Sequence, residues 1–111
     1  MEIVFHTRNA DLAEDFRSIA SHKLLTLQRF GIPLDGVKVE IIHEANPRFG
    51  KTSHSVTLSS FGSGPFMRGE GKAFNDLAAF DQAVKSVELQ LRKVHERIKD
   101  FGHESLREAK G

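Results

Sequence analysis

The sequence predicts an α+β fold, a β-α-β-β-β-α two-layer sandwich with two helices packed on one face of a four-stranded sheet. Two observations carry this prediction. Segments with strand character and two segments of helical periodicity follow one another in that order, and the second helical pattern is long and regular. The chain has 111 residues, which suits one domain. Such a chain buries about two thirds of its unfolded surface, so folding requires neither a metal nor a disulfide.

The first strand and the first helix are predicted before residue 31. The segment Glu2–Arg8 has strand character. Asn9 or Asp11 then offers a helix N-cap, and Asp11 with Glu14 fits a capping box. A helix is expected because one apolar stripe follows at helical spacing, formed by Leu12, Phe16, Ile19, Ala20, Leu24 and Leu27. Gly31 ends this helix.

Three further strands are predicted in the middle of the chain. Residues 37–42 alternate as a strand with one buried face does, and residues 44–51 form a polar loop. Residues 55–61 alternate again, and residues 66–72 return after a Gly-Ser-Gly-Pro turn, so these two segments form a hairpin. If the first two strands are parallel neighbours, their connection is right-handed and the first helix covers one face of the sheet.

The last predicted element is an amphipathic helix over residues 76–99, opened by Asn75 or Asp76. It would be about 36 Å long at 1.5 Å per residue. Its buried stripe is spaced 3, 4, 3, 4, 3, 4 and comprises Leu77, Phe80, Val84, Val87, Leu91, Val94 and Ile98. We therefore assign residues 1–101 to the domain and expect residues 102–111 to be a flexible tail or the start of a linker.

Composition narrows the classes of function. The chain has no cysteine, which excludes disulfides, thiolate metal sites and cysteine nucleophiles. Its first residues are not typical of a secretory signal, and no stretch approaches the roughly 20 apolar residues of a membrane span. The expectation is a cytoplasmic protein without membrane contact. The net charge is only +1, so a surface that binds nucleic acid must be local.

Nothing in the sequence predicts an enzyme, a cofactor or a small-molecule substrate. The six histidines are scattered, with no pair at ligand spacing on one predicted helix, and this indicates no metal site. The serines of residues 53–63 lie in or beside a hairpin without the neighbours of a nucleophile. The glycines of residues 62–71 lack the Gly-Lys-Ser/Thr sequence of a phosphate-binding loop.

A local basic surface is nevertheless predicted on the second helix. Residues 85–99 contain five basic and two acidic side chains. Lys85, Arg92 and Lys99 recur every seven residues and share one row, while Lys93 and Arg97 form a second row at i, i+4. Cations that extend this set are Lys23, Arg29, Arg8 and Arg68, with Arg48 and Lys51 in the 44–51 loop. Taken alone, this pattern also fits the solvated outer face of an ordinary amphipathic helix.

Residues 75–81 read Asn-Asp-Leu-Ala-Ala-Phe-Asp, and Gln-Leu-Arg-Lys follows at 90–93. Arg8-Asn9 after the first strand, the HEANPR of residues 43–48 and the GPFMRGE of residues 64–70 are further motifs. In order and spacing, the chain resembles the ribosome hibernation promoting factor family, and in the last two motifs its actinobacterial-type branch. Two departures are Ser86, where the family usually has Lys, and Leu89, where it often has Arg.

The resemblance implies a domain that binds the small ribosomal subunit through ribosomal RNA. There it would occupy the path of messenger and transfer RNA and inhibit translation during stress or stationary phase. The basic residues named above would be its RNA contacts. Long members of the family pair two ribosomes through a second, C-terminal domain, so a homodimer is expected only through such a domain. Whether this chain is a short member or the N-terminal half of a long one stays open.

Two other functions stay open at this point. The open face or edge of the sheet would suit a protein-interaction module. The order β-β-β-α after a helix is also that of a generic double-stranded RNA binder. Charge reversal at Arg92 and Lys93 separates the first alternative from ribosome binding, and equal affinity for any RNA duplex would indicate the second.

Overall fold

The computed structural model describes residues 1–31, 34–46 and 51–110, and the side chains of these residues apart from 45, 46, 51, 52 and 98–110. Arg48 lies outside the described residues, and the side chains of Lys51 and Lys99 do too. The elements in chain order are β1 (Glu2–Arg8), α1 (Phe16–Leu25), the 3-10 helix η1 (Thr26–Phe30), β2 (Gly36–Asn46), β3 (Lys51–Phe61), β4 (Arg68–Ala73) and α2 (Asp76–Lys110).

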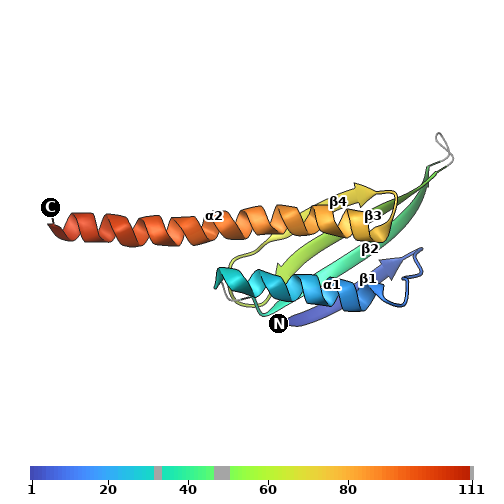
Figure 1. Ribbon diagram of the computed structural model, residues 1–111, viewed down its shortest axis with the longest axis horizontal. Helices are drawn as coiled ribbons and strands as arrows, with labels where there is room; N and C mark the ends of the chain where they lie inside the picture. The colour runs from blue at the N-terminus through green and yellow to red at the C-terminus, as the bar shows by residue number, and fades with distance from the viewer. Residues whose placement is uncertain (32–33, 47–50, 111) are drawn as a thin grey trace.

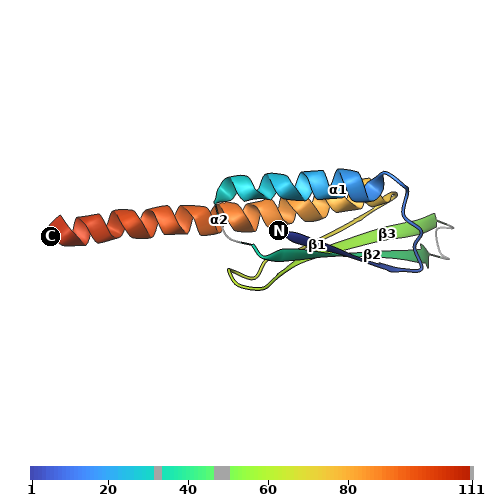
Figure 2. The ribbon, with the colours of Figure 1, turned by 90° about the horizontal axis from the view of Figure 1, so that it is seen from below.

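The four strands form one mixed sheet in the order β1-β2-β3-β4. β1 runs parallel to β2, whereas the β2–β3 and β3–β4 pairs are antiparallel. Both helices lie on the same face of this sheet, side by side and in the same direction, and none of the described residues forms a helix on the opposite face (Figures 1 and 2). The predicted α+β two-layer sandwich is confirmed.

The predicted start of the first helix is wrong. α1 begins at Phe16, with Asp15 at the N-cap position and no hydrogen bond from its side chain, so neither the Asn9 or Asp11 cap nor the Asp11–Glu14 capping box forms. Because β1 pairs parallel to β2, the chain must leave the sheet after β1 and cross to the layer of helices. Residues 9–15 form this connection, so the helix cannot begin earlier. Asn9 makes the first bend of this connection with a left-handed φ of 54°. Gly31, with a φ of 68°, ends η1 as expected.

The middle strands are longer than predicted. β2 continues to Asn46 and β3 begins at Lys51, so residues 44–46 and 51 of the expected polar loop belong to strands, while residues 47–50 lie outside the described residues. A polar sequence is compatible with a strand whose outer face meets water. β4 begins at Arg68 rather than at residue 66, and α2 continues past residue 99 to Lys110. With 35 residues, α2 is about 52 Å long, and its orange-to-red half projects beyond the sheet (Figure 1). The division at residue 101 stays a prediction.

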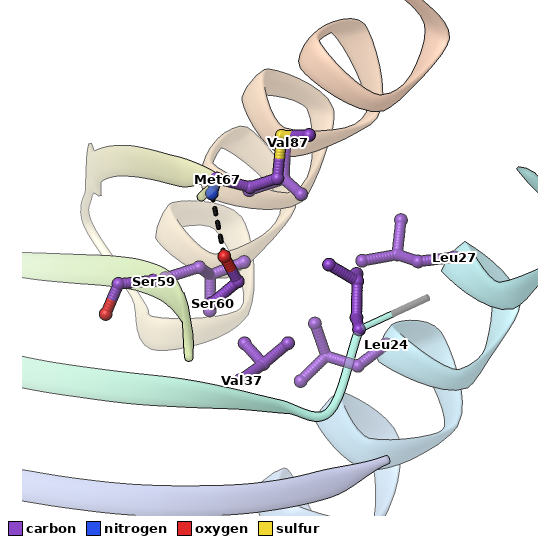
Figure 3. A pocket seen from close by; sticks show the side chains of 9 residues that line it. Leu24, Leu27, Val37, Ser59, Ser60, Met67 and Val87 are labelled. Carbon is purple, nitrogen blue, oxygen red and sulfur yellow. Dashed lines mark hydrogen bonds between the residues drawn. The ribbon is translucent and has the colours of Figure 1, made fainter. Parts of the chain in front are cut away.

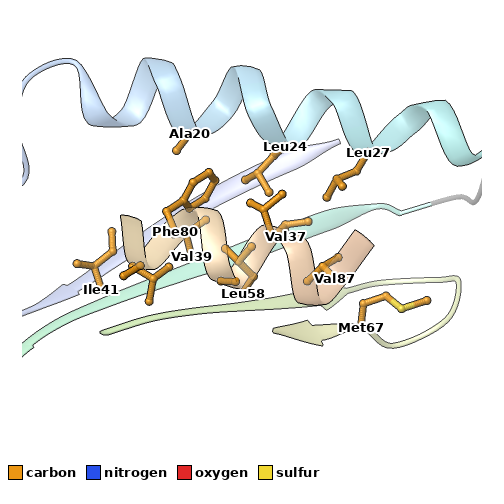
Figure 4. Close-up of a cluster of buried hydrophobic side chains, with 14 of the residues drawn as sticks. Ala20, Leu24, Leu27, Val37, Val39, Ile41, Leu58, Met67, Phe80 and Val87 are labelled. Carbon is orange, nitrogen blue, oxygen red and sulfur yellow. The ribbon is translucent and has the colours of Figure 1, made fainter. Parts of the chain in front are cut away.

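The core lies between the two helices and the inner face of the sheet (Figure 4). Phe16 of α1 meets Phe80 of α2 edge to face, with ring centroids 5.8 Å apart. Residues with less than one tenth of their surface exposed include Val39 and Ile41 of β2 and Leu58 of β3. The core follows the predicted stripe of α2 from Phe80 to Leu91, with Val94 partly buried against it. The helix therefore leaves the core at about the turn that follows.

The buried face of α2 is rotated slightly from the predicted stripe. Leu77 is 36% exposed, whereas Ala79 and Ala83 are fully buried. The reason is the close seating of α2 on β4. An added Cβ on Gly71 would lie 2.0 Å from the Ala79 carbonyl oxygen, and one on Gly69 would lie 2.4 Å from that of Ala83. Small residues on both elements let the helix backbone approach the strand.

Two glutamines of α2 also cap the outer edge of β4. The Gln82 Oε1 atom accepts a hydrogen bond from the Lys72 backbone N–H at 3.1 Å. Gln90 Oε1 accepts one from the Arg68 N–H at 3.1 Å, and Gln90 Nε2 donates to the Arg68 carbonyl. An edge strand with free N–H and C=O groups invites pairing with another chain. The glutamines occupy those groups at two positions and fix the register of α2 along β4.

A small apolar cavity lies at the end of the core (Figure 3). The side chains that line it include Leu24 of α1, Leu27 of η1, Val37 of β2, Met67 before β4 and Val87 of α2. Its volume of about 10 Å³ is close to the minimum for one water molecule. On its rim, the Met67 N–H donates to Ser60 Oγ at 2.7 Å. The cavity is too small for a ligand and reflects packing alone.

Asp35 ties the β3–β4 turn to the start of β2, and we expect this tie to depend on pH. The Ser63 hydroxyl and the Ser63 N–H each donate to Asp35 Oδ2 at 2.7 Å. These hydrogen bonds hold the pKa of Asp35 below its ordinary value of 3.8. Because the folded pKa is lowered, the carboxylate stabilises the fold above the ordinary pKa, and this contribution is lost as the pH falls through the lowered value.

Asp35→Asn keeps an acceptor oxygen and removes the charge. We expect this variant to be less stable than the wild type by a constant margin above about pH 5, and the margin to shrink as the pH falls toward and below the Asp35 pKa. Urea unfolding followed by circular dichroism over a pH series measures this. A margin that stays constant down to the acid end would contradict the role of the charge.

Candidate nucleic-acid interface

The exposed face of α2 carries four of the predicted basic residues. Lys85, Arg92, Lys93 and Arg97 are all exposed, and none of the acidic side chains that the structure describes forms an ion pair with them. Lys85 and Arg92 lie two turns, or about 10.5 Å, apart along the helix. A rigid row of unpaired cations at such spacing can follow the phosphates of a nucleic acid, with Arg forming forked contacts and Lys acting as a point charge.

Two acidic residues of α2, Asp81 and Glu88, pair with cations of α1 and η1. Asp81 forms an ion pair with Lys23 of α1. Glu88 lies 3.9 Å from Arg29 of η1, whose guanidinium also stacks 5.0 Å from the Phe30 ring centroid. Glu88 thus lies beside Arg29 and forms no ion pair with Arg92 of its own helix. These two carboxylates are therefore engaged outside the row of α2 cations, whereas Glu96 lies exposed one turn from Arg92 and Lys93 without an ion pair among the described side chains.

Lys23 and Arg29 are predicted RNA contacts whose charges are already paired with carboxylates of α2. Both lie beside α2, but each has a carboxylate partner. Both pairs are at least partly open to water, where such a pair contributes at most about 1 kcal/mol, so an RNA phosphate could displace the carboxylate. They remain predicted RNA contacts that are weaker than those of α2.

Arg68 lies close to the basic row. Its backbone is hydrogen-bonded to Gln90, one turn before Lys93 on α2. Its side chain projects from the outer side of β4 and pairs with Glu70 at 2.8 Å, with both side chains more than half exposed. Arg68 therefore borders the α2 surface, but its charge is partly balanced.

Arg8 is remote from the α2 row. It ends β1, on the opposite edge of the sheet from β4, which is about 14 Å away across three strand spacings. Its nearest charged neighbours belong to β2, where Lys38 pairs with Glu40 at 2.8 Å. Lys38, with smaller contributions from His6 and Arg8, holds the pKa of Glu40 below its ordinary value. If Arg8 binds RNA, it does so on a second surface.

Leu89 sits within the basic face. It is 56% exposed and stands four residues after Lys85 and three before Arg92, so all three share one side of the helix. Ser86 is partly buried on the β4 side, where Gln90 Nε2 approaches its hydroxyl. The two positions at which the resemblance leads us to expect cations thus differ in exposure. Position 86 faces β4, and only position 89 is exposed to solvent.

The structure also assembles three residues that the sequence did not bring together. His43 of β2 and His54 of β3 are register partners, and both contact Asp76, the first residue of α2. The spacing of histidines along single predicted helices does not reveal a pair on neighbouring strands. A prediction in which the two strands continue to the pair Asn46 and Lys51 would have placed the two histidines opposite each other.

The chain shares its fold with solved structures and its sequence pattern with a known family. The fold is that of the N-terminal domain of Protein Y from Thermus thermophilus, with a TM-score of 0.68 and 23% identity over 85% of this chain and 99% of that one. A ribosomal subunit interface protein from Coxiella burnetii matches with a TM-score of 0.67 and 17% identity, over 85% and 97% of the two chains. Residues 3–99 match the family described as "Sigma 54 modulation protein / S30EA ribosomal protein". The chain belongs to this family.

A relative with higher identity is the "Ribosome hibernation promotion factor" of Mycobacterium tuberculosis. It is 39% identical over 98 residues, which are 88% of this chain and 45% of the relative. The chain thus spans about half the length of this curated relative. Separately, none of the described helices combines the length and the apolar composition needed to cross a bilayer.

Proposed function

We propose that this domain binds the small ribosomal subunit through ribosomal RNA, occupies the path of messenger and transfer RNA, and inhibits translation during stress or stationary phase. Family membership and the name of the Mycobacterium tuberculosis relative support ribosome hibernation as the process. Cytoplasmic localisation follows from this proposal, because ribosomes are the target. The family offers no precedent for an enzyme, and the domain acts by binding.

The observation that carries the proposal is the unpaired cation row on α2. Binding to RNA rests on the neutralisation of phosphates, and cations already engaged with carboxylates contribute less. Lys85, Arg92, Lys93 and Arg97 have no partner among the described acidic residues. They occupy a straight helix whose second half projects away from the sheet (Figure 2). Such a rod can enter a channel of folded RNA and contact its backbone by shape, because base edges in RNA helices are poorly accessible.

The test is co-sedimentation of the purified domain with isolated small and large ribosomal subunits through a sucrose cushion, repeated over a salt series. We expect pelleting with the small subunit only, weakening as salt rises with a slope of about 0.7–0.9 per phosphate contacted. Equal pelleting with both subunits, or with any RNA duplex, would indicate a generic RNA binder. No pelleting at low salt would contradict the proposal.

The alternative of a protein-interaction module has one supporting observation. No helix of the described part of the chain covers the outer face of the sheet (Figure 2), and Phe61 on its border is 40% exposed. However, Lys38 pairs with Glu40 and Arg68 with Glu70 on this face, so its charges are balanced locally rather than directed at a partner. A partner that binds here would be unaffected by changes on α2.

A further inference from the structure

Three side chains from three elements meet at the end of the sheet where α2 begins. His43 Nε2 and His54 Nδ1 each lie 2.8 Å from the same oxygen, Asp76 Oδ1. The imidazole rings are 4.2 Å apart and nearly edge to face. One potential ligand atom from each residue falls within 4.8 Å of the other two. The cluster is the one such group of three among the described side chains.

Several contacts hold the three residues in this position. His43 and His54 face each other across the β2–β3 ladder, so their Cβ atoms are fixed by the strand register. Asp76 is fixed at the start of α2 because Asn75 Oδ1 accepts a hydrogen bond from the Ala78 N–H at 2.7 Å and caps the helix. A site whose ligands come from rigid elements requires little reorganisation on binding.

The cluster is shielded but not sealed. The side chains of His43, His54 and Asp76 are 17%, 20% and 14% exposed. Ligand atoms are therefore largely removed from competing water, while one side remains open to solvent. This is the arrangement of a metal site with three protein ligands and a free position for water.

We propose that His43, His54 and Asp76 form a binding site for a late first-row divalent cation, for which Zn²⁺ is the best match. Two imidazole nitrogens and one carboxylate oxygen suit Zn²⁺ and its neighbours, whereas Mg²⁺ and Ca²⁺ require mainly oxygen ligands. Tetrahedral Zn²⁺ with bonds of about 2.0–2.1 Å places its ligand atoms about 3.3 Å apart. The two nitrogens would have to move away from Asp76 Oδ1 by about half an ångström, which small ring rotations provide.

Without a metal, the same atoms form a hydrogen-bonded cluster in which each histidine donates to Asp76. That arrangement joins β2, β3 and α2 by itself, so the cation adds a bond between elements that are already close. The N-terminal end of α2 carries a partial positive charge, which favours the Asp76 carboxylate and opposes a cation. The single negative ligand and this dipole predict a reversible site rather than one that holds its metal through purification.

The test is calorimetric titration of the full chain with ZnCl₂ in metal-free buffer. We expect one Zn²⁺ per chain, a melting temperature that rises with Zn²⁺ concentration, and no binding of Mg²⁺ under the same conditions. His54→Ala and Asp76→Asn should each weaken Zn²⁺ affinity at least about tenfold. The matched control is His22→Ala, which removes an exposed histidine of α1 and should leave the affinity unchanged.

A second measurement on the unmodified chain covers the case in which a variant fails to fold. Nitrogen-15 spectra of the histidine side chains should show Zn²⁺-dependent shifts at His43 Nε2 and His54 Nδ1, and at no other imidazole of the described residues. Absence of stoichiometric Zn²⁺ binding, shifts confined to other histidines, or equal loss of affinity in His22→Ala would each overturn the site. Metal binding here is independent of ribosome binding by α2, so neither test decides the other.

Discussion

Gly71→Ala is expected to lower the free energy of unfolding by about 3 kcal/mol, which is the upper end of the usual cost of overpacking. The new Cβ would lie 2.0 Å from the Ala79 carbonyl oxygen and 2.7 Å from Gln82 Cβ. Because the nearest obstacle is helix backbone, no side-chain rotation can relieve the clash and α2 must shift. Replacing Gly by Ala also stabilises by restricting the unfolded chain, but only by about 0.4–1 kcal/mol.

Urea unfolding followed by far-ultraviolet circular dichroism measures this effect, since the chain has no Trp or Tyr. The matched control is Glu70→Ala on the same strand, where the side chain is exposed on the outer face. That change should alter stability by less than about 0.5 kcal/mol. Similar stabilities of the two variants would show that α2 is not seated on β4 as closely as described.

The double variant Arg92→Glu/Lys93→Glu is expected to lose measurable binding to small ribosomal subunits at physiological salt. Two unpaired cations of the α2 row become anions, so attraction to phosphate is replaced by repulsion. If both residues contact phosphate, the slope of log affinity against log salt should fall by about 1.4–1.8. Both positions are exposed, so folding stability should change by no more than about 0.5 kcal/mol.

Single variants provide a control matched in residue type and charge. Arg92→Glu and Arg17→Glu each change the net charge by the same amount on an exposed helical position, but Arg17 lies on α1 over the Phe5 ring. We expect a large loss of affinity for the first and a small one for the second. Lys23→Ala, which removes a cation already paired with Asp81, should fall between them. Equal losses in the two Arg→Glu variants would mean that net charge, rather than the α2 row, determines binding.

Much of the fold was predictable because periodicity determines it. The 3-4 spacing located α2 and its core residues from Phe80 to Leu91, and alternation located the middle strands. The start of α1 was not predictable. Asp11 and Glu14 satisfy a capping pattern, but residues 9–15 are needed to connect the end of β1 to the layer of helices. The close approach of Gly71 to Ala79 was also missed, since small residues contribute almost nothing to an apolar stripe.

The candidate site was predictable only in part. The sequence placed Lys85, Arg92 and Lys93 on an exposed helix face, and the structure confirms their exposure. The pairing of Lys23 with Asp81 depends on α1 lying beside α2, which spacing along one helix does not reveal. The His43–His54 contact depends on the β2–β3 register, which could not be known while residues 44–51 were taken for a loop.

The most direct test of the proposed function is competition between this domain and initiator transfer RNA on isolated small subunits. The domain is bound at a fixed salt concentration, initiator transfer RNA with messenger is added in increasing amounts, and both are quantified in the pellet. Occupation of the messenger and transfer RNA path predicts that each ligand displaces the other in proportion to its concentration. Simultaneous binding of both ligands to the same subunits would contradict it.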